Sequence, residues 1–164
     1  MNARETFEEI YEEYADPIFR HIYYRLGDRE RALELSQTVF TNLWKYLASG
    51  KTVEYPQAFL YRSAKHAFLN EIRVDRKAAS LEVMAETGFD PAYSGEDAEE
   101  LSEQREAVER LKELPEAYRE VLLLRYVEGM RVRDIAKALG IRENTVSVRI
   151  ARGIEKLKEL YGQP

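Results

Sequence analysis

The sequence contains no cysteine and only two histidines, His21 and His66. The lack of cysteine excludes disulfides, thiol catalysis and cysteine-ligated zinc, and two histidines do not favour a histidine-rich metal site. No apolar stretch approaches the roughly 20 residues of a membrane-spanning helix. The N-terminus is acidic and periodic, without the basic and apolar segments of a signal peptide. We therefore expect a cytoplasmic protein with no metal ion and no cofactor.

Signals of catalysis are also missing from the sequence. Neither a phosphate-binding glycine loop nor a nucleophile–base pair occurs at a meaningful spacing. We therefore expect a protein that is not an enzyme and has no small-molecule substrate.

The net charge of −5 averages over very unequal segments. Residues 77–100 carry one basic and seven acidic side chains, whereas residues 131–164 carry eight basic and four acidic ones. An acidic chain is a poor nucleic-acid binder on bulk charge alone, but a segment with a net charge of +4 attracts phosphates. The distribution predicts a basic C-terminal segment behind an acidic tether.

Apolar residues recur at helical spacing along most of the chain, which predicts an all-α fold. Asp is a common N-cap residue, and Pro is common at the first position of a helix. Asp16 and Pro17 therefore predict that one helix ends here and another begins. We also expect a helix to begin after Asp28 and to end at 49–51, and another to cover residues 57–76.

Residues 77–97 hold Gly88, Pro91, Gly95 and most of the acidic excess, with weak periodicity, which is typical of a linker. The sequence therefore predicts two small helical domains, residues 1–76 and 98–164, joined by an acidic flexible linker at 77–97.

The last two predicted helices, residues 131–139 and 143–160, have the features of a helix-turn-helix. Ala136 permits a close approach of the helices and Gly140 frees the turn. A generic helical hairpin also fits this pattern, but the basic bias favours DNA binding. The outward-facing side chains of the second helix contact base edges in such a motif, and flanking cations contact phosphates. The candidates for contacts to bases are Asn144, Ser147, Val148, Ala151 and Arg152, and those for contacts to phosphates are Arg142, Arg149 and Lys156. Thr145, at the start of the second helix, is a further DNA-binding candidate.

Two blocks of the sequence resemble extracytoplasmic-function (ECF) sigma factors of the sigma-70 family. Residues 114–129 (LPEAYREVLLLRYVEG), 134–140 (DIAKALG) and 145–149 (TVSVR) resemble region 4 of that family. Residues 32–40 (ALELSQTVF) with Leu43 and Trp44 resemble the region 2 helix that binds the polymerase clamp, and residues 58–66 (AFLYRSAKH) resemble the following segment, which opens the promoter.

The resemblance implies an alternative sigma factor that gives promoter recognition to core RNA polymerase, through the β′ clamp and the β flap. Region 4 is then expected to bind the upstream promoter element as duplex, and region 2 to capture unstacked bases of the downstream element. The loop at 48–55 and Tyr61, Arg62, Lys65, His66, Asn70 and Arg73 are assigned to the downstream element, and Glu34, Gln37, Phe40, Leu43 and Trp44 to the polymerase. An anti-sigma factor is a further partner consistent with the resemblance, because apolar binding faces need masking.

The sequence departs from the family pattern at four positions. Glu34 and His66 stand where members often carry Asp and Asn, and Ser147 and Val148 stand where they often carry a basic residue and a Ser. Val148 can contact a thymine methyl but cannot donate a hydrogen bond.

Some alternatives remain open on the sequence. The chain could be a self-sufficient helix-turn-helix regulator, with salt-dependent operator binding, or a sigma-like adaptor that has lost promoter opening. Phe40, Trp44 and Tyr61 fit a core as well as an interface, and His66 fits a structural histidine among apolar neighbours.

Overall fold

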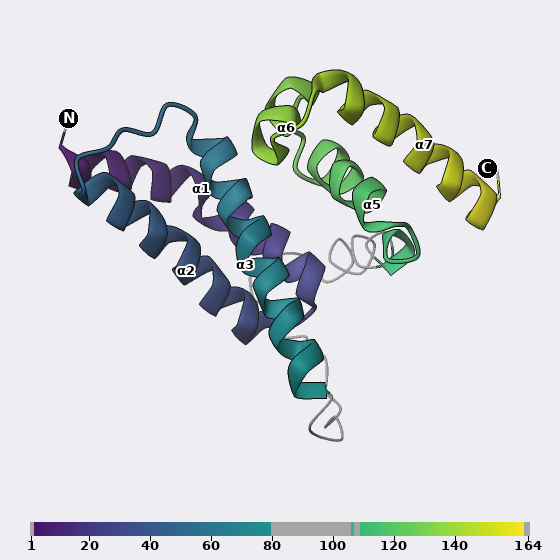
Figure 1. Ribbon diagram of the computed structural model, residues 1–164, viewed down its shortest axis with the longest axis horizontal. Helices are drawn as coiled ribbons and strands as arrows, with labels where there is room; N and C mark the ends of the chain where they lie inside the picture. The colour runs from purple at the N-terminus through teal and green to yellow at the C-terminus, as the bar shows by residue number, and fades with distance from the viewer. Residues whose placement is uncertain (1, 80–105, 107–108, 163–164) are drawn as a thin grey trace. The chain divides into compact units, whose positions relative to one another are not determined.

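The computed structural model describes residues 2–79, 106 and 109–162, and every regular element in these ranges is a helix (Figure 1). This confirms the all-α fold. The chain divides into two compact units, which are described separately here as the N-terminal and C-terminal units. The N-terminal unit contains α1 (Ala3–Leu26), α2 (Arg29–Ala48) and α3 (Pro56–Ala79).

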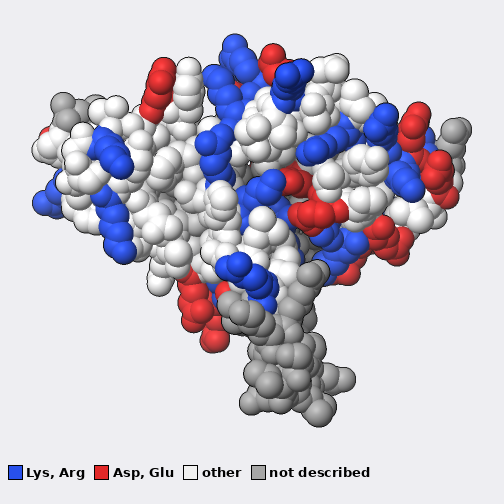
Figure 2. Space-filling view, in the orientation of Figure 1, with Lys and Arg blue, Asp and Glu red and all other residues white. Residues whose placement is uncertain are grey.

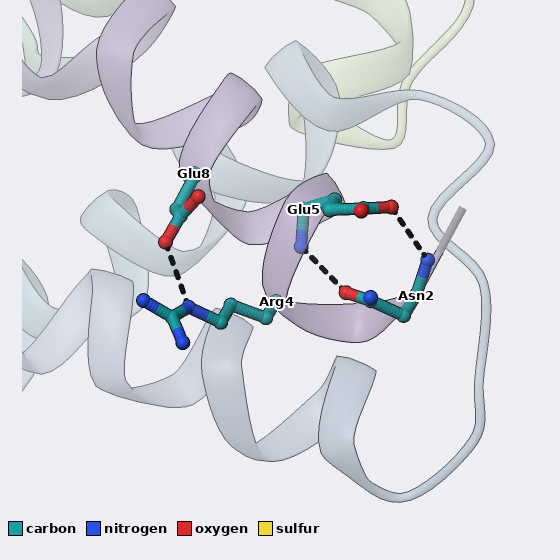
Figure 3. A network of polar contacts seen from close by, with 4 residues as sticks. All are labelled: Asn2, Arg4, Glu5 and Glu8. Carbon is teal, nitrogen blue, oxygen red and sulfur yellow. Dashed lines mark hydrogen bonds and ion pairs between the residues drawn. The ribbon is translucent and has the colours of Figure 1, made fainter.

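The first helix begins at a reciprocal cap. The Glu5 backbone N–H donates to Asn2 Oδ1 at 2.9 Å, and the Asn2 backbone N–H donates to Glu5 Oε2 at 3.2 Å (Figure 3). The Nε of Arg4 donates to Glu8 Oε1 at 2.9 Å one turn further along. The capping box satisfies backbone donors that would otherwise lack partners at a helix start.

The expected break at Asp16 and Pro17 is wrong, because α1 continues through Pro17 to Leu26. Proline lacks the N–H that would bond to the preceding turn, which normally disfavours it inside a helix. The segment after it contributes Ile18 and Ile22, which are almost fully buried, so burial outweighs the local preference.

The packing of α1, α2 and α3 buries one apolar stripe from each helix. The largest fully buried side chains of the unit are Ile18, Ile22, Val39, Leu43 and Leu60. The turn between α1 and α2 is as predicted: Gly27 adopts a left-handed conformation (φ 74°), and Asp28 Oδ1 accepts from the Arg31 backbone N–H at 3.2 Å.

A half-buried ion pair joins the start of α2 to the second half of α3. The Nη2 and Nε of Arg31 each lie 2.7 Å from Glu71 Oε1. The helix α3 extends to Ala79, three residues beyond the expected end at 76. Of the predicted linker at 77–97, residues 80–97 lie outside the described residues.

The C-terminal unit contains a π-helical segment that the sequence analysis missed. Three consecutive leucines, residues 122–124, are all buried across the point where the α-helix changes to a π-helix. The Glu128 backbone N–H donates to the Leu123 carbonyl at 3.0 Å, and Gly129 then ends the segment at φ 67°, as expected. The described helices of this unit are α5 (Glu116–Leu122), η1 (Leu123–Val127, the π-helix), α6 (Val132–Leu139) and α7 (Glu143–Tyr161).

Gly153 of α7 lies close against α5. A Cβ at this position would lie 2.9 Å from Leu122 Cδ1 and 3.3 Å from Tyr118 Cβ. We therefore expect Gly153→Val to destabilise the C-terminal unit by about 1–3 kcal/mol through overpacking. Urea unfolding followed by far-UV circular dichroism measures the effect. The exposed Glu155→Val substitution on the same helix controls for β-branching, and equal losses in the two variants would contradict the close approach.

The buried imidazole of His21 makes the N-terminal unit sensitive to acid. Burial, with a smaller effect of the Arg25 charge, lowers the pKa of His21 from 6.5 to about 3. Between these values the unfolded chain binds the additional proton, so stability falls as the pH is lowered below about 6.5, by up to about 1.4 kcal/mol per pH unit.

We expect His21→Phe to reduce the slope of unfolding free energy against pH between pH 7 and 5. Urea unfolding at several pH values measures this slope. His66→Gln is the matched control, since it removes the other histidine of the chain from an exposed position. A wild-type slope retained in His21→Phe would contradict a neutral buried imidazole.

Candidate nucleic-acid and polymerase interfaces

The helix-turn-helix predicted for the C-terminal unit is present. The helix α6 ends at Gly140, which adopts a left-handed conformation (φ 69°), and the Ile141 backbone N–H donates to the Ala136 carbonyl at 3.1 Å. Ala136 is buried at the crossing, and Val146 of α7 is fully buried against the same core. The turn chemistry and the inward face of α7 therefore agree with the sequence.

The outward side of α7 leaves the predicted base-contacting residues accessible. Val148 is 37% exposed on this side of the helix. The half-buried side chains Ile150 and Leu157 mark the opposite, inward side. Among the candidates, Arg142, Asn144, Ser147, Val148, Ala151, Arg152 and Lys156 are exposed, and Thr145 and Arg149 are half-buried.

The charge around this face is basic. Figure 2 shows Lys and Arg side chains gathered over the part of the C-terminal unit that contains α6 and the start of α7. Basic side chains of both helices contribute to this positive charge, and Arg131 and Arg133 are exposed at the start of α6. Such a concentration attracts the phosphate backbone, in spite of the negative charge of the whole chain.

The helix α3 carries a second row of polar side chains. Arg62, His66, Asn70 and Arg73 follow one another at intervals of four or three residues and are all exposed, so they share one face of the helix. Lys65 beside them is half-buried. Arg73 Nη2 donates to Asn70 Oδ1 at 3.1 Å. The alternative of a structural histidine among apolar neighbours is wrong for His66, because this side chain is exposed.

Tyr61 does not lie on this polar face. It is 4% exposed, and its ring contacts the His21 ring edge-on, with centroids 5.2 Å apart. The side chain packs between α1 and α3, so of the two alternatives left open for Tyr61 the structure agrees with the core and not with base contact.

The loop between α2 and α3 contacts Tyr46 at the end that follows α2. Ser49 Oγ donates to the Tyr46 carbonyl at 2.7 Å, and Lys51 Nζ lies 5.2 Å from the Tyr46 ring centroid. At the other end Tyr55 is 51% exposed. An anchored loop with an exposed aromatic ring suits the stacking of an unpaired base.

A groove of about 600 Å³ runs between α1 and α2. Its walls at one end are aromatic: the rings of Phe7 and Trp44 lie 5.6 Å apart, and those of Tyr11 and Phe40 lie 4.9 Å apart. We name this cavity the α1–α2 groove. Its lining residues are Phe7, Tyr11, Ala15, Asp16, Phe19, Arg29, Leu33, Ser36, Gln37, Phe40, Thr41 and Trp44.

The α1–α2 groove contains three of the five residues assigned to polymerase, namely Gln37, Phe40 and Trp44. Trp44 is 41% exposed, while Phe40 is buried except for the groove. Glu34 is exposed on the same helix. Leu43 has no exposed surface, so the surface position predicted for it is wrong, and its side chain stabilises the core.

A second groove, of about 520 Å³, lies in the C-terminal unit between η1 and the end of α7. The sequence analysis missed it, although Tyr126 and Val127 follow the three buried leucines after a single residue, Arg125. Tyr126 is 63% exposed and Val127 is 39% exposed, and both line the groove with Leu122, Ile154 and Leu157. Apolar side chains exposed in this way are typical of a protein-binding surface.

The described residues contain no group of three or more His, Cys, Asp or Glu side chains placed to hold a metal ion. None of their helices combines the length and the apolar character needed to cross a membrane.

Two family models match the chain in the order of its units. The model "Sigma-70 region 2" matches residues 10–78, and the model "Sigma-70, region 4" matches residues 104–157. The chain belongs to the ECF sigma factors of the sigma-70 family. The region 2 match covers the lining of the α1–α2 groove except Phe7, and the region 4 match covers the helix-turn-helix up to Leu157.

Similar sigma factors have comparable lengths. The chain is 26% identical to RNA polymerase sigma factor SigZ of Bacillus subtilis, over 94% of this chain and 86% of SigZ. It is 25% identical to ECF RNA polymerase sigma factor SigW of the same organism, over 95% of this chain and 89% of SigW.

Two solved structures have the same fold as this chain. The sigma factor RpoE of Bartonella quintana, in complex with the anti-sigma factor NepR, superposes with a TM-score of 0.73 at 18% identity and covers 95% of this chain and 96% of RpoE. CnrH, in complex with the cytosolic domain of CnrY, superposes with a TM-score of 0.67 at 19% identity and covers 96% of this chain and 88% of CnrH.

Proposed function

We propose that this sigma factor binds core RNA polymerase and directs promoter-specific transcription initiation, as a binding protein and not as an enzyme. The observation that carries the proposal is that one chain combines an aromatic groove in region 2 with an exposed, basic helix-turn-helix in region 4. Neither feature alone separates a sigma factor from other DNA-binding proteins. Together they provide one surface for polymerase and one for DNA, and we place the protein in the cytoplasm with the polymerase.

Region 4 binds the upstream promoter element as a duplex. The exposed side of α7 enters the major groove, where Asn144, Ser147, Val148, Ala151 and Arg152 face base edges. Thr145 lies at the start of this helix. Arg142, Arg149 and Lys156 lie beside the row and neutralise phosphates, which orients the helix but does not select the sequence.

Region 2 captures the downstream element after its strands separate. The exposed row Arg62, His66, Asn70 and Arg73, with Lys65, attracts the single strand, and the loop at 48–55 contributes Tyr55 as a stacking surface. Holding unpaired bases stabilises the open promoter, because it offsets the cost of unstacking them.

Polymerase binds both units. The α1–α2 groove and the adjacent Glu34 bind the β′ clamp, and the second groove, beside Tyr126 and Val127, binds the β flap. The acidic segment at 77–97 joins the two units and follows the basic RNA path of the polymerase, where its negative charge imitates nucleic acid. An anti-sigma factor would mask the same apolar grooves in the free protein.

Gel-shift titration of promoter duplex, with and without core polymerase, tests this function. We expect weak binding by the free protein and sequence-specific binding once polymerase is present. Tight, salt-dependent operator binding without polymerase would instead indicate a self-sufficient regulator. Permanganate footprinting of the same complexes distinguishes an adaptor, which would leave promoter thymines unreactive.

A further inference from the structure

The centre of the outward face of α7 is occupied by two apolar side chains. An α-helix turns by about 100° per residue, so Val148 and Ala151 lie about 200° and about 140° from the fully buried Val146 around the helix axis. They therefore stand on either side of the line directly opposite the core. By the same count, Ser147 and Arg152 lie nearer the two edges of the exposed face.

This placement decides which part of DNA each side chain meets. In a helix docked in the major groove, the centre of the outward face points to the base edges, and the flanking positions point to the phosphates. The side chains of Val148 and Ala151 are exposed and have neither a donor nor an acceptor. Their contact with a base is therefore apolar, and the apolar group that a base presents in the major groove is the 5-methyl of thymine.

The polar residues on the same line place this contact in the first half of α7. Asn144 lies one turn before Val148, and Glu155 lies two turns after it, and both are exposed. A carboxylate repels phosphates, so Glu155 disfavours a close approach of DNA to the second half of the helix. The first half is also the part that contacts bases in a helix-turn-helix.

We infer that Val148, with Ala151 beside it, selects a thymine in the upstream element by contact with its 5-methyl group. Residues three apart are neighbours on a helix surface, so the two side chains form one apolar contact. The inference rests on the proposed function and names the base and the chemical group that this part of α7 recognises. The thymine stands on either strand, since both edges of a base pair are presented in the major groove.

Replacement of single thymines by deoxyuridine tests the inference on the DNA, because the change removes the methyl and keeps the base pairing. The probes are duplexes that carry the upstream element found by mapping transcription start sites, and each is titrated with the holoenzyme. At one thymine we expect deoxyuridine to weaken binding by about 3- to 10-fold, the size expected for one buried methyl group.

Val148→Ala tests the protein side of the same contact. It should weaken binding to the native element by a similar factor and abolish the preference for thymine over deoxyuridine at that position, because the two changes remove one shared contact. The side chain is exposed and alanine favours helices, so the unfolding midpoint should not fall. Leu160→Ala is the matched control, since it shortens an exposed aliphatic side chain of the same helix and should leave this preference unchanged.

Wild-type affinity for every single deoxyuridine duplex would overturn the inference, and so would an upstream element made of G·C pairs alone. An undiminished preference for thymine in Val148→Ala would also overturn it, because another side chain would then contact the methyl. A holoenzyme that binds promoter and unrelated duplexes equally would instead contradict the proposed function, so the two failures are distinguishable.

Discussion

Trp44→Ala should weaken binding to core RNA polymerase by roughly 30- to 1,000-fold, equivalent to about 2–4 kcal/mol. The indole lines the α1–α2 groove beside Phe7, yet 41% of its surface is exposed in the free chain. A large aromatic ring that becomes desolvated only on binding contributes more to affinity than to folding. Titration of the labelled protein with core polymerase measures the affinity.

Leu160→Ala is the comparison for Trp44→Ala. Leu160 is 48% exposed on α7 and lines neither groove, so its removal should leave polymerase affinity unchanged. Thermal unfolding distinguishes loss of the surface from loss of the fold. A Trp44→Ala variant that binds as tightly as the wild type would contradict the position of the polymerase surface on α2.

Arg152→Ala should reduce holoenzyme affinity for the native upstream element by about 1–3 kcal/mol, or roughly 5- to 150-fold. The guanidinium is exposed on the outward side of α7, where it can donate two parallel hydrogen bonds to a guanine edge. Its loss should also relax base preference at a single position of the element. Affinity measured against a set of promoters with single base changes tests both effects.

Lys156→Ala is the informative counterpart, because Lys156 is also exposed on α7 but is assigned to a phosphate. Its loss should weaken all promoter variants equally and decrease the salt dependence of binding. If Arg152→Ala and Lys156→Ala changed the affinity for every promoter variant in the same way, the separation of base-contacting and phosphate-contacting residues on α7 would be contradicted.

The parts of the fold that depend on local chemistry could be predicted from the sequence. Gly27 and Asp28 mark the turn between α1 and α2, and Gly140 marks the turn of the helix-turn-helix, because each has a backbone or capping role that few other residues fill. The exposed row on α7 could also be predicted, because the apolar Val146 shows which side of the helix faces the core.

The parts that depend on tertiary packing could not be predicted. Pro17 remains within α1 because residues after it are buried, and no local signal reports that burial. The π-helical segment lies where three consecutive leucines are buried, and the groove beside Tyr126 is lined by side chains of both η1 and α7, so neither can be recognised from local sequence. Helical periodicity alone also could not separate Leu43, which is fully buried, from Trp44, which is exposed one residue later.

Run-off transcription from genomic fragments with core polymerase, followed by mapping of the start sites, tests the central claim most directly. We predict that the wild-type protein, added to core polymerase, produces transcripts with defined start sites that share a common upstream and downstream element. Arg152→Ala should lower the yield from these same sites. Absence of any defined start site with active core polymerase and folded protein would contradict the function proposed for this chain.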